Sequence, residues 1–222
     1  IPLPPLAEQE ALVAEVEGYQ RVIDGARQVL AHYKPRITID PQWEMVELGE
    51  VTSFFTDGDW IESKDQSPEG IRLIQTGNIG IGEYLERGEK ARYISPETFV
   101  RLNCTQVLPG DVLVSRLPDP VGRACMIPAL PGKLITGVDC SIIRFDQKKM
   151  LPGFFVGYTQ SDEYLRSIQQ KLTGSTRLRI SRSNLGLIKI PLPPLAEQQR
   201  IVAELEEERR LVAANAALVA RM

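Results

Sequence analysis

The amino-acid sequence predicts an α+β fold: one mixed α/β domain flanked by two long helices that form an antiparallel coiled-coil spacer. Three observations predict it. The nine residues at 1–9 recur unchanged at 190–198, and each copy leads into a helical pattern. Apolar residues then follow at spacings of four and three, which is typical of coiled coils. The stretch between the copies lacks regular strand–helix–strand alternation, which favours mainly antiparallel or irregular strand pairing.

The repeat extends beyond nine residues, because thirteen of the first seventeen positions are identical at an offset of 189. Solenoid repeats recur every 20–50 residues or so, so this offset indicates two modules whose helices bracket a globular domain. In both copies three prolines favour an extended lead. Glu8 and Glu197 then mark the first helical turns, where the helix dipole favours negative charge.

The first helix is predicted from about Leu6 to Tyr33, where Lys34-Pro35 ends it, and the second begins around Leu195. The apolar seam of the first helix comprises Leu12, Val16, Tyr19, Ile23, Ala26, Leu30 and Tyr33. The second seam comprises Ile201, Leu205, Glu208, Val212, Asn215, Val219 and Met222, so two polar residues interrupt it. An amphipathic helix packed on a globular core is the alternative. The length favours a spacer, since about 28 residues span about 42 Å.

We expect three regions: a helical region and linker at 1–40, a globular domain at 41–190 and a C-terminal helix at 191–222. Within the domain, patterning predicts strands at 43–51, 71–74, 112–114, 123–127 and 135–145. A short helix at 95–99 is predicted from the possible cap Ser95 and from Pro96, and a longer helix is predicted at 152–172. Turn-forming residues predict loops at 54–70 and 174–177.

Composition is that of an ordinary globular protein, with 25% charged and 43% hydrophobic residues. No apolar run approaches the roughly 20 residues that span a bilayer, and no signal peptide is evident. The first residue is not Met, which indicates a piece of a longer or processed protein. Cys104, Cys125 and Cys140 are odd in number and lack CxxC spacing, which predicts reduced, buried thiols in a cytoplasmic protein. The only histidine, His32, is far from them in sequence, so no metal site is expected.

Charge is unevenly distributed. The net charge of −3 argues against nucleic-acid binding, but 164–190 contains six positive residues and no acidic one. The local field decides such contacts more than the total charge, so this segment is a candidate DNA surface. A solvated basic face is the alternative interpretation.

Several motifs resemble those of type I restriction-modification specificity subunits. They are Pro191–Val202 with its preceding Gly174-Ser-Thr and Leu185–Ile190, Trp43 with Glu47–Val51, Thr76–Ile79, and Gly110–Leu113. The resemblance implies two target recognition domains per subunit, each followed by a conserved helical region. This chain resembles the central helix, the second recognition domain and the C-terminal helix.

The resemblance also implies a function: a non-catalytic half-subunit that reads one half of a bipartite target on double-stranded DNA. It needs no cofactor and docks modification (methyltransferase) and restriction subunits. The paired helices would set the distance between half-sites, a geometric property of rigid readers. Because the first half is missing, we also expect a homodimer through the conserved helices, with Asn215 helping to set its register.

The predicted DNA contacts lie in and beside the Gly174 loop: Lys171, Ser175, Thr176, Arg177, Arg179 and Arg182. Base readout is predicted more weakly for Gln75, Asn78 and Arg116, because these side-chain types can pair with base edges. Two other function classes stay open. One is a protein-only scaffold. The other is an enzyme, for which Pro118-Asp119 with Asp146-Gln-Lys148 gives a permissive nuclease pattern, without any phosphate-binding loop or methyltransferase motif.

Overall fold

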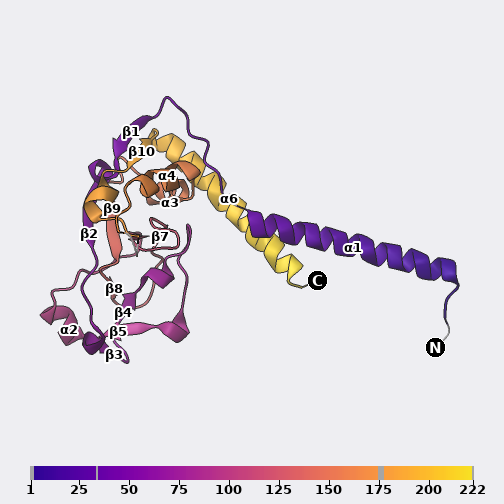
Figure 1. The fold of residues 1–222 in the computed structure, drawn as a ribbon, viewed down its shortest axis with the longest axis horizontal. Coiled ribbons are helices and arrows are strands. Elements are labelled where there is room, and N and C mark those ends of the chain that lie inside the picture. Colours follow the sequence, from indigo (N-terminus) through magenta and orange to yellow (C-terminus); the bar gives the residue numbers. More distant parts are fainter. Residues whose placement is uncertain (1–2, 34, 175–177, 222) are drawn as a thin grey trace. The chain divides into compact units, whose positions relative to one another are not determined.

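A computed structural model describes residues 3–33, 35–174 and 178–221 (Figure 1). The chain forms two compact units. One is the domain unit, residues 36–202, and the other is the helical unit, residues 1–35 with 203–222. Within the described residues, no helix is long and apolar enough to cross a membrane.

α-Helices occur in both units, and short 3-10 turns occur in the domain unit. The α-helices are α1 (Leu6–His32), α2 (Pro96–Arg101), α3 (Pro152–Tyr158), α4 (Asp162–Gln170), α5 (Arg182–Gly186) and α6 (Leu195–Val219). The 3-10 turns are η1 (Leu48–Val51), η2 (Ser63–Asp65), η3 (Thr76–Asn78) and η4 (Gly88–Lys90). Both long helices begin where the sequence predicted them, and the first ends one residue early.

In the part of the chain that the structure describes, ten short strands build three sheets. They are β1 (Glu44–Glu47), β2 (Thr52–Asp57), β3 (Gln66–Ser67), β4 (Ile71–Ile74), β5 (Arg92–Ile94), β6 (Val112–Ser115), β7 (Ala124–Met126), β8 (Leu134–Thr136), β9 (Cys140–Phe145) and β10 (Lys189–Leu192). Their orders are β1-β10, β2-β9-β6-β7 and β3-β5-β4-β8. Pairing is antiparallel except between β4 and β8, so the expected mixed α+β class with mainly antiparallel pairing is confirmed.

Four element predictions were wrong in detail. The strand predicted at 43–51 ends at Glu47, where η1 begins. The helix predicted at 152–172 is two helices, because the Ser161 hydroxyl accepts from the Tyr164 N–H at 3.2 Å and caps a new helix. The strand predicted at 135–145 breaks at 137–139, since β8 and β9 belong to different sheets. The loop predicted at 54–70 contains β3 and most of β2. The cap at Ser95 is confirmed, because its hydroxyl accepts from the Thr98 N–H.

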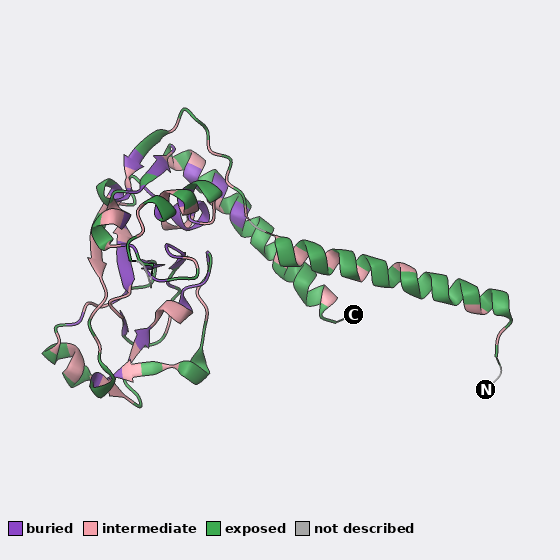
Figure 2. Ribbon diagram, viewed as in Figure 1, coloured by how far each residue is buried: buried purple, intermediate pink, exposed green. Residues whose placement is uncertain are grey.

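The core of the domain unit has an aromatic layer beside its sheets. Phe155 lies 5.0 Å from Phe145 and 6.1 Å from Tyr164 between ring centroids, and Tyr158 also contacts Tyr164. The Tyr164 hydroxyl donates to the Gly122 carbonyl at 3.0 Å, which satisfies the one polar atom of a fully buried ring. Burial strongly raises the Tyr164 pKa. Figure 2 shows the buried residues concentrated in this unit.

The sequence repeat is also a structural repeat. In the first copy the Gln9 side-chain amide donates to the Pro4 carbonyl at 2.7 Å, and in the second Gln198 donates to Pro193 at 2.9 Å. Both bonds reach back five residues and tie the proline lead to the first helical turn. Identical residues therefore give the same local structure in two different surroundings.

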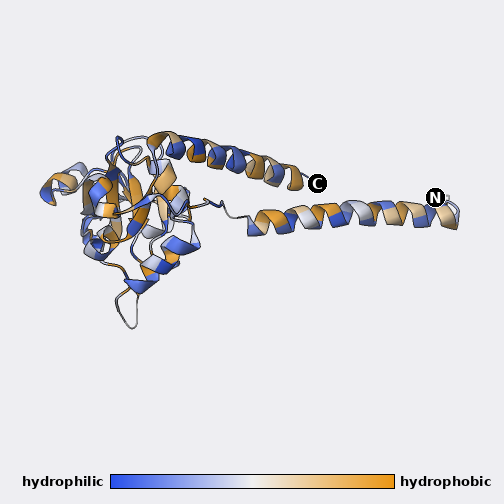
Figure 3. Cartoon of the chain, turned by 90° about the horizontal axis from the view of Figure 1, so that it is seen from above, coloured by the Kyte–Doolittle hydropathy of each residue, from blue (hydrophilic) through white to orange (hydrophobic). Residues whose placement is uncertain are grey.

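The predicted seam of α1 is covered along only part of its length. Ile23, Ala26 and Leu30 are half-buried. Leu12, Val16 and Tyr19, which we call the open seam, are 55%, 64% and 58% exposed. Apolar positions recur along both long helices in Figure 3.

The two long helices meet at a pair of seam positions. The Tyr33 hydroxyl donates to the Glu208 carboxylate at 2.7 Å. Burial and this hydrogen bond raise the pKa of Tyr33 to about 12. Glu208, one of the two polar residues that interrupt the second seam, therefore contacts a polar group at the end of the first.

Candidate nucleic-acid interface

Two neighbouring cavities on the domain unit form a single basic cleft. Their volumes are about 450 and 440 Å³, and both are lined by Gln75, Thr76 and Arg92. We define the basic cleft by these three residues together with Gln66, Arg87, Lys90 and Arg179. It is open to solvent and mostly polar, which suits a polar polymer better than a small apolar ligand.

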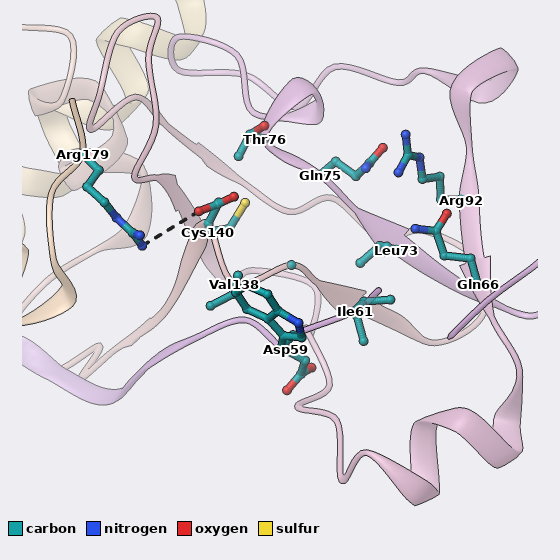
Figure 4. Close-up of a pocket in the computed structure, with 13 residues that line it drawn as sticks. Asp59, Ile61, Gln66, Leu73, Gln75, Thr76, Arg92, Val138, Cys140 and Arg179 are labelled. Atoms are coloured by element: carbon teal, nitrogen blue, oxygen red, sulfur yellow. Dashed lines mark ion pairs between the residues drawn. The ribbon is translucent and has the colours of Figure 1, made fainter. Parts of the chain in front are cut away.

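Short strands of one sheet place the cleft residues side by side. Gln66 lies on β3, Arg92 on β5 and Gln75 directly after β4, and these strands are neighbours in the order β3-β5-β4. Figure 4 shows Gln66, Gln75 and Arg92 along one part of the cavity and Arg179 across from them. Amide and guanidinium groups from distant parts of the sequence therefore converge on one surface.

Positive charge dominates the rim. Arg87, Lys90 and Arg92 are exposed, and no ion pair holds any of them within the described residues. Arg179 has only a long contact of 3.9 Å with Asp139, drawn dashed in Figure 4. Unpaired cations around a polar cleft are free to bind an anionic ligand.

Two carboxylates, those of Asp59 and Asp139, also line the first cavity. The Asp59 carboxylate accepts from the Thr105 N–H at 3.0 Å. Burial raises the Asp59 pKa, because surroundings poor in water disfavour the carboxylate. The four cations of the cleft (Arg87, Lys90, Arg92 and Arg179) outnumber these two carboxylates, so the cleft is positive despite the negative net charge of the chain.

The turn η3 forms one wall of the cleft. The side chain of Asn78 is buried behind this turn and holds it by hydrogen bonds. Asn78 is 4% exposed, its side-chain oxygen accepts from the Gln75 N–H at 3.0 Å, and its amide donates to Leu85 at 2.9 Å. The sequence pattern nominated Asn78 for base readout. Its buried, doubly bonded amide instead shapes the turn, and we no longer propose it as a base contact.

Arg116 has a similar structural position. It is 4% exposed, 3.5 Å from the Asp57 carboxylate, and its guanidinium donates to the Val138 carbonyl at 2.5 Å. A guanidinium enclosed in this way has no free edge to offer a base, so Arg116 is also withdrawn as a base contact. The sequence could not indicate this, because the burial of an arginine cannot be inferred from its residue type.

The other nominated residues are partly accessible. Arg182 is exposed, and its guanidinium lies 3.4 Å from the Phe55 carbonyl and 3.5 Å from the Thr56 hydroxyl. Lys171 is half-buried at the end of α4. Ser175, Thr176 and Arg177 lie outside the described residues. Of the nominated arginines that the structure describes, Arg179 is the one that lines the cleft.

Sequence analysis missed Arg87, Lys90 and Arg92. They alternate with Glu83, Glu86 and Glu89, so the segment has no basic run. Glu86 forms its ion pair elsewhere: its carboxylate lies 3.0 Å from the Arg72 guanidinium and accepts a hydrogen bond from the Tyr84 hydroxyl. Isolated basic residues mixed with acidic ones are common on protein surfaces, so the sequence alone could not distinguish these three.

The proposed nuclease residues have other surroundings. The Asp146 carboxylate accepts from the Lys148 N–H at 3.0 Å within its own turn. Asp119 and Arg123 line a further cavity, which shares Thr76, Gly77 and Arg87 with the second cavity of the basic cleft. Throughout the described part of the chain, no cluster of three or more acidic, histidine or cysteine residues could hold a metal ion. The three cysteines are free and buried.

Comparison with known proteins assigns the family. The model of the type I restriction modification DNA specificity domain matches residues 41–215, which is more than half of the chain. The chain therefore belongs to this family. The family predicted from the sequence motifs is therefore confirmed.

Individual relatives agree. The EcoKI specificity subunit of Escherichia coli K12 is 34% identical over 139 residues, covering 61% of this chain and 29% of the relative. The putative MjaX specificity subunit of Methanocaldococcus jannaschii is 27% identical over 237 residues, covering 93% and 51%. The chain thus spans about half or less of these relatives.

Solved structures share the fold. The HsdS subunit from Thermoanaerobacter tengcongensis is 26% identical with a TM-score of 0.62, covering 99% of this chain and 55% of that one. A chain from a structural study of complex assembly and conformational transition of the type I R-M system is 27% identical with a TM-score of 0.61. The match covers 100% of this chain and 57% of that one. The long flanking helices predicted from the sequence are part of this shared fold.

Proposed function

We propose that the chain reads one half of a bipartite DNA target for a type I restriction-modification system, and that the basic cleft is its DNA-contacting surface. The observation that carries the proposal is the convergence of three unpaired cations, Arg87, Lys90 and Arg92, around the carboxamides of Gln66 and Gln75. DNA presents the complementary chemistry, which is a row of phosphates beside base edges.

The cations and the glutamines make different contacts with DNA. Long, exposed cations neutralise phosphates and supply affinity that does not depend on sequence. Glutamine can form two hydrogen bonds with an adenine edge, so Gln75 and Gln66 are the proposed base contacts. Arg179, Arg182, Lys171 and the loop residues Ser175, Thr176 and Arg177 extend the contact on the Gly174 side.

Selection of DNA from a random pool tests the function. The chain, incubated with its methyltransferase partner, should enrich one short sequence, and its affinity for the selected duplex should fall steeply with salt. Each neutralised phosphate adds about 0.9 to the slope of log affinity against log salt, so four or more contacts give a slope of roughly −4. No enrichment over a scaffold protein of equal charge, with a flat salt response, would favour the protein-only scaffold.

The helical unit is the proposed assembly surface. The open seam leaves Leu12, Val16 and Tyr19 exposed. Exposed apolar side chains at coiled-coil spacing bind a partner helix. We propose that modification and restriction subunits dock through the conserved helices. In their absence, a second copy of the chain pairs there to give a two-fold dimer, which would favour a palindromic, interrupted site.

Sedimentation velocity tests the dimer. At micromolar concentration the chain should sediment as a dimer, and Leu12→Asp with Val16→Asp should convert it to a monomer because two charges enter the seam. Ala14→Asp adds a charge to the same helix on the face away from the seam and should leave the dimer intact. A wild-type monomer that persists at high concentration would eliminate self-pairing and leave the seam to the methyltransferase subunits.

A further inference from the structure

Arg123 is a buried cation with no carboxylate partner in the described structure. It lies just before β7 and is 9% exposed. Burial lowers its pKa, yet an arginine remains charged in proteins. A buried charge is unfavourable unless hydrogen bonds replace its lost water, so the contacts of this guanidinium must compensate it.

The guanidinium binds four main-chain carbonyls on two separate turns. Its Nε donates to Ile79 at 2.8 Å and its Nη2 to Thr76 at 2.9 Å. Its Nη1 donates to Leu117 at 2.9 Å and to Pro120 at 3.0 Å. The planar fork of arginine can reach all four oxygens at once, which the single ammonium group of lysine cannot do.

A second arginine lies against the same turn from the cleft. A Cβ added to Gly77 would come within 2.7 Å of an Arg87 guanidinium nitrogen, so Arg87 rests where a side chain would otherwise be. The turn η3 therefore lies between Arg123, whose hydrogen bonds hold its carbonyls, and Arg87, which only rests over Gly77 and is exposed on the rim. This turn carries Thr76 and follows directly on Gln75, the wall of the basic cleft.

We propose that Arg123 is a positioning residue for sequence readout: it holds the turn from Gln75 to Ile79 in the shape that presents the cleft wall to base edges. The proposal rests on the proposed function, in which the cleft binds DNA. Phosphate contacts give affinity and fixed base contacts give specificity. Loss of Arg123 therefore acts on discrimination between sequences, whereas loss of a rim cation acts on all sequences alike.

Arg123→Lys, compared with Arg144→Lys, tests this. Arg144 is a matched control because its guanidinium is also largely internal, bonded to Asp111 and Gln106, and lines none of the cleft. The measured quantity is the ratio of Kd for a scrambled duplex to Kd for the duplex selected by the wild-type chain. Arg123→Lys should lower this ratio at least about tenfold, with the scrambled Kd within about twofold and the salt slope unchanged. An unchanged ratio, or an equal loss in Arg144→Lys, would overturn the proposal.

Amide hydrogen exchange keeps the proposal testable if Arg123→Lys does not fold. In the free wild-type chain, the amides of Asn78, Ile79 and Leu85 donate within this turn and should be protected before DNA is added. Exchange at the rate of an open loop would contradict a turn held from inside. If the wild-type chain binds no sequence preferentially, the proposed function fails, and the exchange measurement still reports on the turn.

Discussion

Replacing Arg87, Lys90 and Arg92 together by alanine should weaken DNA binding by roughly a hundredfold at low salt. All three are exposed on the rim of the basic cleft without an ion pair in the described structure, so their removal leaves no partner stranded and little effect on folding is expected. If each neutralises one phosphate, the slope of log Kd against log salt should fall by about 2.7. Fluorescence anisotropy over a salt series measures both quantities.

A matched triple variant separates local contacts from net charge. Lys64, Lys133 and Lys148 are exposed cations of the domain unit that line neither cavity of the cleft. Their replacement by alanine removes the same three charges and should lower affinity only slightly, since exposed charges beyond about 10 Å are screened. Equal weakening by both triples would mean that overall charge, and not the cleft, attracts DNA.

The long helices could be predicted because their information is local. Prolines at fixed positions, a glutamate in the first turn and apolar residues at spacings of four and three all lie within thirty consecutive residues. The capped starts at Ser95 and Ser161 are equally local, although only the first was recognised. Ser161 lay inside an apolar pattern that continued on both sides of it, and this pattern concealed the end of α3.

The cleft could not be predicted because its information is non-local. Gln66, Gln75 and Arg92 become neighbours only through the order β3-β5-β4, and β3 and β5 are two and three residues long. Strands this short show no alternation in sequence. The same limit explains Arg116, because the burial of a charged residue depends on which segments fold over it. The sequence motifs identified the family, and the strand order identified the surface.

The glutamine at the same position of the two repeat copies makes different numbers of hydrogen bonds, so its contribution to stability should differ. Gln9 makes one described side-chain bond, to the Pro4 carbonyl. Gln198 is fully buried and makes three: its oxygen accepts from the Leu151 N–H at 2.7 Å, and its amide donates to Lys149 at 2.8 Å and to Pro193 at 2.9 Å. It therefore joins the start of α6 to the segment that begins α3, within the domain unit.

Gln198→Ala should lower the free energy of unfolding of the domain unit by about 3 kcal/mol, because one buried carbonyl, one partly buried carbonyl and one partly buried N–H lose their partners. The midpoint of thermal unfolding should fall by roughly 6–12 °C. Gln9→Ala deletes the same side chain from the same nine-residue motif, where it breaks a single partly exposed bond, and should cost about 1 kcal/mol or less. Urea denaturation of both variants, followed by circular dichroism, compares them directly. Equal losses would mean that the proline–glutamine motif itself carries the stability; a large loss confined to Gln198→Ala would mean that docking of α6 onto the domain carries it.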